Sequence, residues 1–238
     1  MPEVVNEFIK TKDISKVIKK QKEILNAYDK DIAKYATSGV REKVRECYNS
    51  IPDQLAKENK KYKYKLLRDG GNARHYSTSL NWISDAGLGS KVYRLKCFDI
   101  PLKAYRYEAS FKFYLNDTGL LLSMYEENVQ YDILKGNLGV FKGGIFENVI
   151  AQILSSNEMP TCYYRRDDRL EIDFVTIINN KIVSIEVKSG TNTKSKSFNN
   201  VLEKENIEYG IKLSLNNVNC SNPKIKCFPL YLAMFIGR

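Results

Sequence analysis

The segment from Glu171 to Gly190, EIDFVTIINNKIVSIEVKSG, contains the residues best suited to chemistry in this chain. Two strand-like runs flank Asn179-Asn180, and asparagine accepts the positive φ angles of a two-residue hairpin turn. Such a turn places Asp173 directly opposite Glu186. Because facing carboxylates repel each other and destabilise a sheet, we expect a divalent cation to lie between them.

A lysine completes this arrangement. Alternation along the strands puts Lys188 on the face of the two carboxylates and opposite Glu171. There it could orient or deprotonate an attacking water and steady a phosphate, so that metal and lysine hydrolyse a phosphodiester without histidine. The other face is expected to pack on the core through Ile172, Phe174, Val183, Ile185 and Val187. The alternative is a surface hairpin whose Glu171–Lys188 ion pair is exposed and contributes little stability.

Composition limits the metals that could bind. The chain has one histidine, His75, and five scattered cysteines without a CxxC pair: Cys47, Cys97, Cys162, Cys220 and Cys227. No histidine base is therefore expected, and no zinc-type ligand spacing exists. Oxygen ligands remain, which favours magnesium or manganese. We expect five free thiols in a reducing compartment.

The charge balance favours a polyanionic partner. The formal net charge is +10, and the excess is spread over both halves of the chain. Nucleic acid is the first candidate, although a Lys-rich surface without such a partner has the same composition. No window approaches the roughly 18–20 consecutive apolar residues of a membrane span, and the N-terminus lacks a signal-peptide layout. We expect a cytoplasmic protein without a membrane partner.

Two regions precede the chemistry-bearing segment. Residues 1–36 are predicted to be helical, most clearly over 14–35, with Asp13 as the N-cap. Residues 37–110 are predicted to form a second unit. Its expected elements are helices over residues 40–48, from 51 onward with Pro52 in the first turn, and over 72–85 before Gly87, followed by a hairpin over 91–106.

Three helices followed by a hairpin are the order of elements in a winged-helix module. In that arrangement the third helix faces DNA and the hairpin forms the wing. The expected nucleic-acid contacts are Arg74 and Tyr76 on the helix and Lys91 and Arg94 on the wing, with further helix candidates at His75, Ser79 and Asn81. The alternative is a module that serves only for protein packing.

Residues 111–238 are predicted to form an α/β (α+β) domain with a mixed sheet flanked by helices. A short strand and a helix capped near Asp117 come first, followed by the helix GGIFENVIAQILSS. The expected strands lie over residues 161–165, 171–178, 182–188, 209–215 and 225–228, with a helix over 197–205. The facing carboxylates thus belong to the second and third of these strands.

The runs EIDFV and IVSIEVKSG resemble the core of the PD-(D/E)xK nuclease superfamily, whose restriction-endonuclease-like fold also occurs in Holliday-junction resolvases. The resemblance implies metal coordination by Asp173 and Glu186, with Lys188 catalytic. In many members a helix glutamate also faces the metal, and Glu147 is the matching position; the alternative is an ordinary exposed helix charge. Two residues after the hairpin weakly match further polar groups of resolvase-like relatives: Lys196 and Ser197.

A wider resemblance covers nearly the whole chain. SIPDQLAKENKKYKY, LNWISDAGL, FKFYLNDTGLL and GGIFENVIAQIL are similar to the C-terminal region of bacterial and archaeal predicted AAA-type ATPases, in which a winged-helix segment and a domain of unknown function follow the ATPase. The P-loop pattern G-x-x-x-x-G-K-[ST] is missing, so no ATP binding is expected from this chain alone. The resemblance implies that residues 1–36 are a remnant of the ATPase helical region, which favours self-association or packing against a separate ATPase.

These observations lead to three hypotheses. The first is an enzyme: a magnesium-dependent, nuclease-like domain that acts on DNA and is guided by a winged helix. The second is a module of the same fold that binds nucleic acid or protein without cutting. The third is an accessory fragment whose work depends on an ATPase. The retained Asp173, Glu186 and Lys188 favour the first, although fold alone does not imply function.

Overall fold

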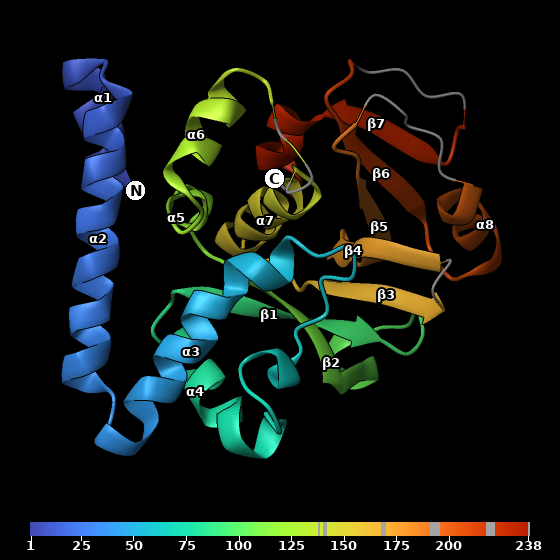
Figure 1. The fold of residues 1–238 in the computed structure, drawn as a ribbon. Helices are drawn as coiled ribbons and strands as arrows, with labels where there is room; N and C mark the ends of the chain where they lie inside the picture. Colours follow the sequence, from blue (N-terminus) through green and yellow to red (C-terminus); the bar gives the residue numbers. More distant parts are fainter. Residues whose placement is uncertain (138, 140–141, 168–169, 191–195, 218–221, 238) are drawn as a thin grey trace. The chain divides into compact units, whose positions relative to one another are not determined.

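The computed structural model describes residues 1–137, 139, 142–167, 170–190, 196–217 and 222–237 (Figure 1). The chain divides into two compact units. The helical unit comprises residues 1–59, 63–90 and 115–141, and the sheet unit comprises residues 60–62, 91–114 and 142–238. Because each unit draws on several segments, these units do not coincide with the expected divisions 1–36, 37–110 and 111–238.

The helical unit begins as the sequence predicts. Asp13 caps the second helix by accepting a hydrogen bond from the Ser15 N–H (2.9 Å), and Asn72 caps the fourth helix through the His75 N–H. Its elements are α1 (Pro2–Thr11), α2 (Ile14–Tyr35), α3 (Ser38–Leu55), η1 (Tyr64–Leu66), α4 (Ala73–Asp85), α5 (Thr118–Ser123) and α6 (Glu127–Leu134). Among the described residues, no helix is both long and apolar enough to cross a membrane.

The prediction of two short helices over 40–48 and from residue 51 is wrong, because α3 is continuous through Pro52. A proline this close to the helix end removes one backbone hydrogen bond. A single buried stripe maintains the helix on both sides of it, made of Val44, Cys47, Ile51 and Leu55. Burial of that stripe therefore outweighs the local signal for a new helix start.

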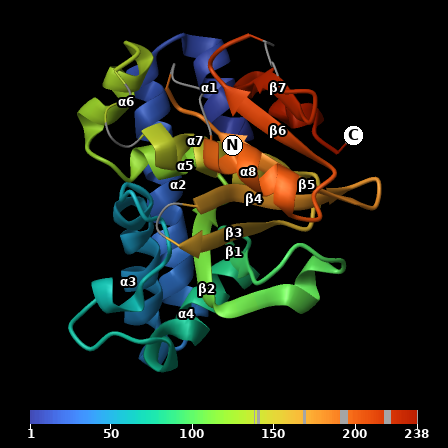
Figure 2. The same ribbon diagram turned by 90° about the vertical axis from the view of Figure 1, so that its right-hand side faces the viewer.

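The sheet unit carries most of a seven-stranded mixed sheet (Figure 2). Its strands are β1 (Gly89–Leu95), β2 (Arg106–Leu115), β3 (Cys162–Asp167), β4 (Leu170–Ile178), β5 (Lys181–Val187), β6 (Tyr209–Ser214) and β7 (Ile225–Pro229), in the order β2-β1-β3-β4-β5-β6-β7. β4 is antiparallel to β3 and β5, while β1–β3, β5–β6 and β6–β7 are parallel. The helices α7 (Lys142–Ser156) and α8 (Lys196–Lys204) cover opposite faces (Figure 2), as the predicted α/β class requires.

The β4–β5 hairpin has the predicted turn and register. Asn179 and Asn180 have φ angles of 50° and 60°, as a two-residue hairpin turn demands. The paired residues run from Ile178 and Lys181 to Phe174 and Ile185. One residue further along this ladder, Asp173 and Glu186 are brought together.

The hairpin is covered on both faces, so the alternative of a surface hairpin does not describe it. Ser184 and Glu186, on the face opposite to Val183 and Ile185, are buried as well. The sequence alternation breaks at a register shift between β3 and β4, where Cys162 pairs with Val175 but Tyr164 pairs with Ile172. Helices on both faces of the sheet produce this burial, as in other doubly covered sheets.

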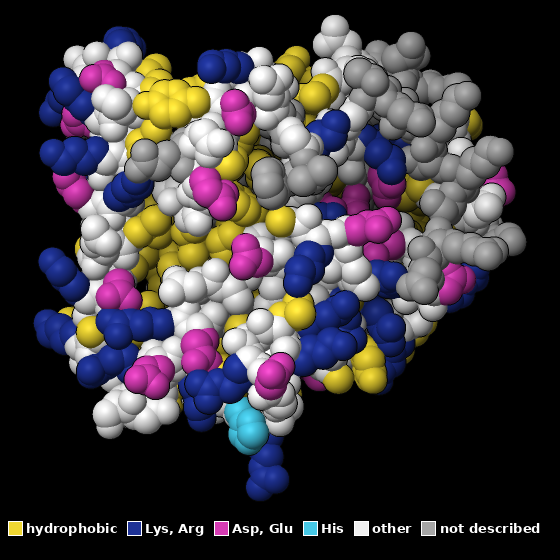
Figure 3. All heavy atoms as spheres, viewed as in Figure 1, with side chains coloured by type: hydrophobic (Ala, Val, Ile, Leu, Met, Phe, Trp, Pro, Cys, Tyr) yellow, Lys and Arg dark blue, Asp and Glu magenta, His cyan; other side chains and the backbone are white. Residues whose placement is uncertain are grey.

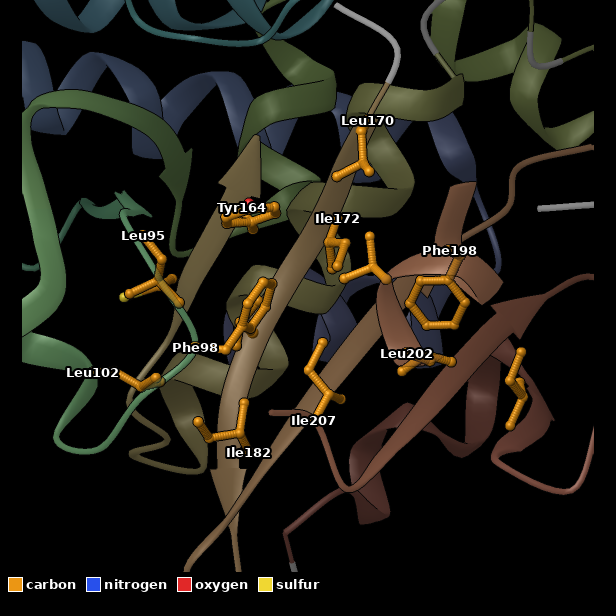
Figure 4. Close-up of a cluster of buried hydrophobic side chains, with 14 residues drawn as sticks. Leu95, Phe98, Leu102, Tyr164, Leu170, Ile172, Ile182, Phe198, Leu202 and Ile207 are labelled. Atoms are coloured by element: carbon orange, nitrogen blue, oxygen red, sulfur yellow. The ribbon is translucent and has the colours of Figure 1, made fainter. Parts of the chain in front are cut away.

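One hydrophobic core of the sheet unit joins α8 to the sheet (Figure 4). Phe198 and Leu202 of α8 pack with side chains from β3, β4 and β5, including Tyr164, Ile172 and Ile182. The close approach needs glycine in β6, since a Cβ atom on Gly210 would lie 2.7 Å from the Phe198 ring. This packing fixes the strands that carry the carboxylates.

Two further expectations differ from the structure. The segment 91–106 does not form a separate wing, because β1 pairs in parallel with β3 and β2 extends the same sheet. The expectation of five free thiols is also wrong: Cys47, Cys97 and Cys162 form no disulfide, but Cys227 is disulfide-bonded. Cys220 lies outside the described residues.

Candidate functional site

The structure brings together the three residues that the hairpin pattern singled out. Asp173 lies on β4, Glu186 on β5, and Lys188 directly follows β5. The Val187 N–H donates to Asp173 Oδ2 (2.8 Å), and Lys188 Nζ lies 2.5 Å from Glu186 Oε1. Asp173 forms no ion pair with another described residue. We refer to Asp173 and Glu186 as the carboxylate pair.

Glu147 of α7 also reaches this region, but its carboxylate is already well bound. Oε1 lies 3.1 Å from Lys60 Nζ, and Oε2 lies 3.1 Å from Lys112 Nζ. The Tyr114 hydroxyl donates to Oε2 as well (2.7 Å). Glu147 is 5% exposed, so the expected alternative of an ordinary exposed helix charge does not describe it.

A chain of ion pairs continues from this glutamate. Lys112, on β2, is 1% exposed, and its Nζ lies 2.7 Å from Glu171 Oε1 on β4. Arg165 Nη1 contacts the other Glu171 oxygen at 3.1 Å. We call Lys60, Glu147, Lys112, Glu171 and Arg165, together with Tyr114, the lysine–glutamate network.

Opposite pKa shifts separate the network from the carboxylate pair. Burial acts to raise the pKa of Glu147, but Lys112 and Lys60 outweigh it and lower that pKa to about 2. Desolvation together with the charges of Glu147 and Glu186 raises the pKa of Asp173 well above its usual range. Burial likewise raises the pKa of Glu186 against the opposing effect of Lys188. The lysine charges thus outweigh burial at Glu147 but do not outweigh it at the pair.

The lysine of the motif is held as a cation. Burial acts to lower the pKa of Lys188, but the adjacent Glu186 carboxylate outweighs it and raises the pKa. At neutral pH the side chain is therefore an ammonium group. In this state it can contact a phosphate or hold a water, but it has no free electron pair with which to accept a proton.

The chemistry of the donors fits a magnesium or manganese ion. Within the described part of the chain, no group of three or more His, Cys, Asp or Glu side chains is placed to hold a metal ion. Magnesium, however, is often bound by one or two carboxylates, with water and substrate phosphate as the remaining ligands. Asp173 and Glu186 supply two carboxylates. Their pKa values are raised, and a bound cation would stabilise the charged form of both groups.

The sequence did not reveal the residues that surround Glu147. Lys60 lies in a polar stretch of the sequence, and Lys112 stands between Phe111 and Phe113 in β2. A lysine flanked by buried aromatic residues at strand spacing was the available signal, since a buried lysine needs a carboxylate partner. The side chains of Lys196 and Ser197 lie outside the described part of the structure.

The predicted nucleic-acid residues fall in both units. In the helical unit Arg74 is exposed on α4, whereas Tyr76 is 1% exposed and its hydroxyl donates to Glu46 Oε2 (2.5 Å). A side chain in that position does not reach a ligand at the surface. In the sheet unit Lys91 and Arg94 are half-buried on β1, each over an aromatic ring: those of Phe111 (5.0 Å) and Tyr107 (4.6 Å).

The fold and this cluster describe a mixed α/β protein with a carboxylate–lysine site, and comparison with known proteins adds a family. Residues 1–131 match the domain of unknown function DUF8612, and residues 142–232 match the domain of unknown function DUF4143. Since the first match covers more than half of the 238 residues, the chain belongs to the DUF8612 family. The domain-of-unknown-function part of the resemblance is thereby confirmed.

No match was found among the curated proteins. Among solved structures, the crystal structure of protein VC1899 from Vibrio cholerae is similar, with 13% identity and a TM-score of 0.27. The alignment covers 84% of this chain and 51% of VC1899, so the chain spans about half the length of that protein. A likeness at this TM-score carries no argument about fold or function.

Proposed function

We propose that the sheet unit is a magnesium- or manganese-dependent, nuclease-like phosphodiesterase domain of the PD-(D/E)xK type that acts on DNA. The observation that carries this proposal is the carboxylate pair: Asp173 and Glu186 are buried on adjacent strands, and burial raises the pKa of both despite the lysines nearby. A fold keeps like charges together at a cost in stability, and a bound cation offsets that cost. Lys188 beside the pair supplies a cationic contact for a phosphate.

Each residue has a defined task in this proposal. Asp173 Oδ1 and Glu186 Oε2, the oxygens not engaged by the Val187 N–H and Lys188, would face the cation. When bound, the ion would polarise a phosphoryl oxygen and lower the pKa of a water. Lys188 would hold the phosphate as an ammonium group, and Glu147 would remain bound to its two lysines and act by positioning the site.

A second function has one observation in its favour. The ion pair between Lys188 and Glu186 uses one carboxylate of the pair, which suits a domain that binds nucleic acid or protein without cutting. The resemblance to the C-terminal region of AAA-type ATPases supports a separate ATPase subunit as partner and a cytoplasmic location. The exposed Arg74 and the net charge of +10 support DNA as a ligand in either case.

The test measures metal binding and cleavage separately. The chain, Asp173→Asn and Glu186→Gln are compared for thermal stabilisation by Mg²⁺ or Mn²⁺ and for cleavage of branched, duplex and single-stranded DNA. We expect metal to raise the Tm of the unaltered chain but not of Asp173→Asn, and cleavage to require both carboxylates. Glu208→Gln is the matched control, because it removes an exposed carboxylate from the same unit.

The outcomes separate the two functions. If metal still raised the Tm of both carboxylate variants, the carboxylate pair would not be the metal site. Stabilisation that depends on Asp173 without any cleavage, while DNA still binds, would favour the binding module. Arg74→Ala should weaken DNA binding and reduce its salt slope by about 1 if this arginine contacts a phosphate. An unaltered slope would exclude that contact.

A further inference from the structure

A hollow of about 440 Å³ lies on the helical unit between α2 and the end of α4. The composition of its lining differs from that of the chain as a whole, which is basic. Its described lining residues are Tyr28, Asp31, Tyr35, Trp82, Asp85, Ala86 and Leu88. The volume is within the range of small-molecule sites. Three aromatic residues and two aspartates line one space, and no lysine or arginine is among the described lining residues.

Helical spacing explains why these side chains converge. Tyr28, Asp31 and Tyr35 are three and four residues apart, which places them on one face of α2. Trp82 and Asp85 are three apart on α4 and share a face in the same way. α2 therefore contributes two aromatic residues and one aspartate, and α4 contributes one of each.

The two aspartates of the hollow are outside the ion pairs of the described residues. Neither Asp31 nor Asp85 forms an ion pair with another described residue, although 38 Lys and Arg side chains occur in the chain. The Tyr35 ring already attracts a cation, since Lys34 Nζ lies 4.8 Å from its centroid without lining the hollow. Aromatic faces attract cations through their quadrupoles, most strongly for tryptophan.

We propose that this hollow binds an organic cation with a methylated ammonium group. A metal ion would gain nothing from three aromatic walls, and an anion would be repelled by both carboxylates. A primary ammonium is strongly hydrated, whereas a methylated one presents apolar methyl groups to rings and positive charge to carboxylates. This site is independent of the carboxylate pair in the sheet unit.

The only tryptophan of the chain reports on the site directly. Trp82 fluorescence is followed while the full chain is titrated with choline or with its neutral isostere 3,3-dimethyl-1-butanol. We expect saturable binding of choline that is about tenfold tighter than binding of the alcohol. Equal affinities, or no saturable change with choline, would overturn the proposal.

Variants test the carboxylates without removing the reporter. Asp31→Asn combined with Asp85→Asn should weaken choline binding about tenfold, and Asp69→Asn, an exposed aspartate elsewhere in the helical unit, should not change it. Unchanged affinity in the double variant would contradict the proposal. A basic peptide with one trimethyllysine distinguishes the sources: tighter binding than choline indicates a protein side chain, and equal or weaker binding indicates a free ammonium compound.

Discussion

Two charged clusters of the sheet unit are built from neighbouring residues yet have opposite electrostatics. In the lysine–glutamate network, three cations face two carboxylates, and every carboxylate oxygen of Glu147 and Glu171 has a cationic contact. In the carboxylate pair, Lys188 contacts only Glu186, and Asp173 accepts a backbone N–H. Glu171 and Asp173 are two residues apart on the same strand.

This difference distinguishes residues that stabilise the fold from residues that are suited to bind a ligand. Buried charges that are paired and hydrogen-bonded hold their surroundings in place, because removal of one partner leaves the other uncompensated. Buried charges that repel one another weaken the fold and persist at sites that act on a ligand. On this comparison the network supports the structure, and the carboxylate pair is the part of the site that we propose to bind a cation.

The largest effect is expected from Glu147→Gln. The substitution leaves Lys60 and Lys112 without their shared carboxylate, and breaking a buried pair of this kind costs about 3–5 kcal/mol. Urea unfolding measures the loss. Lys112→Met in the same chain should recover part of it, since the buried ammonium is then gone as well. A loss below about 1 kcal/mol would mean that the network is not the support that its geometry indicates.

The second-largest effect is expected from pH, because acidification should change the stability contributions of the two clusters in opposite directions. The pKa of Glu147 is lowered from an ordinary 4.5 to about 2, so its stabilising contribution is complete above 4.5 and lost as pH falls toward 2. The pKa values of Asp173 and Glu186 are raised, so their protonation favours the fold, and that contribution is lost as pH rises through the raised values. In metal-free buffer we expect stability to rise from neutral pH toward about 4.5 and then to fall.

Unfolding of the unaltered chain and of Asp173→Asn across this range checks the assignment. The rise on mild acidification should shrink in the variant, because one of the two repelling carboxyls no longer titrates. The fall at low pH should remain, because Glu147 is intact. If Asp173→Asn gained as much stability on mild acidification as the unaltered chain, the raised pKa of Asp173 would not be the cause of that gain.

A smaller effect of opposite sign is expected at neutral pH. Asp173→Asn removes a repelling charge and should raise metal-free stability by up to about 1 kcal/mol. Glu171→Gln, two residues away on the same strand, should lower it, since Lys112 and Arg165 lose a partner. The pair is a matched comparison, with the same change of charge and opposite results. If both substitutions lowered the stability, the proposed difference between a repelling pair and a stabilising network would be wrong.

Local patterns in the sequence predicted the hairpin and part of the site. Asn179-Asn180 fixed the turn, and strand alternation on either side then determined which residues face one another. The cap at Asp13, the helix that carries Glu147 and the mixed sheet also follow from local signals. Each of these depends on residues close together in the chain.

Partners that come from distant segments could not be predicted in this way. Lys60 and Lys112 reach Glu147 across 87 and 35 positions of sequence (147 − 60 and 147 − 112). The parallel pairing of β1 with β3 also joins distant segments, and it turned an expected wing into part of the sheet. Tyr76 has the spacing of an exposed recognition-helix residue, but packing of α4 on α3 buries it.

The smallest effect is expected at the rim of the network. The Arg165 side chain is 20% exposed and contacts Glu171, whose side chain is 29% exposed. Partly exposed ion pairs contribute roughly 0–1 kcal/mol, and Lys112 still compensates Glu171 when Arg165 is removed. Arg165→Ala should therefore cost less than about 1 kcal/mol in urea unfolding and leave Mg²⁺ stabilisation of the chain unchanged. A loss as large as that of Glu147→Gln would place the structural support at Glu171 rather than at the two buried lysines.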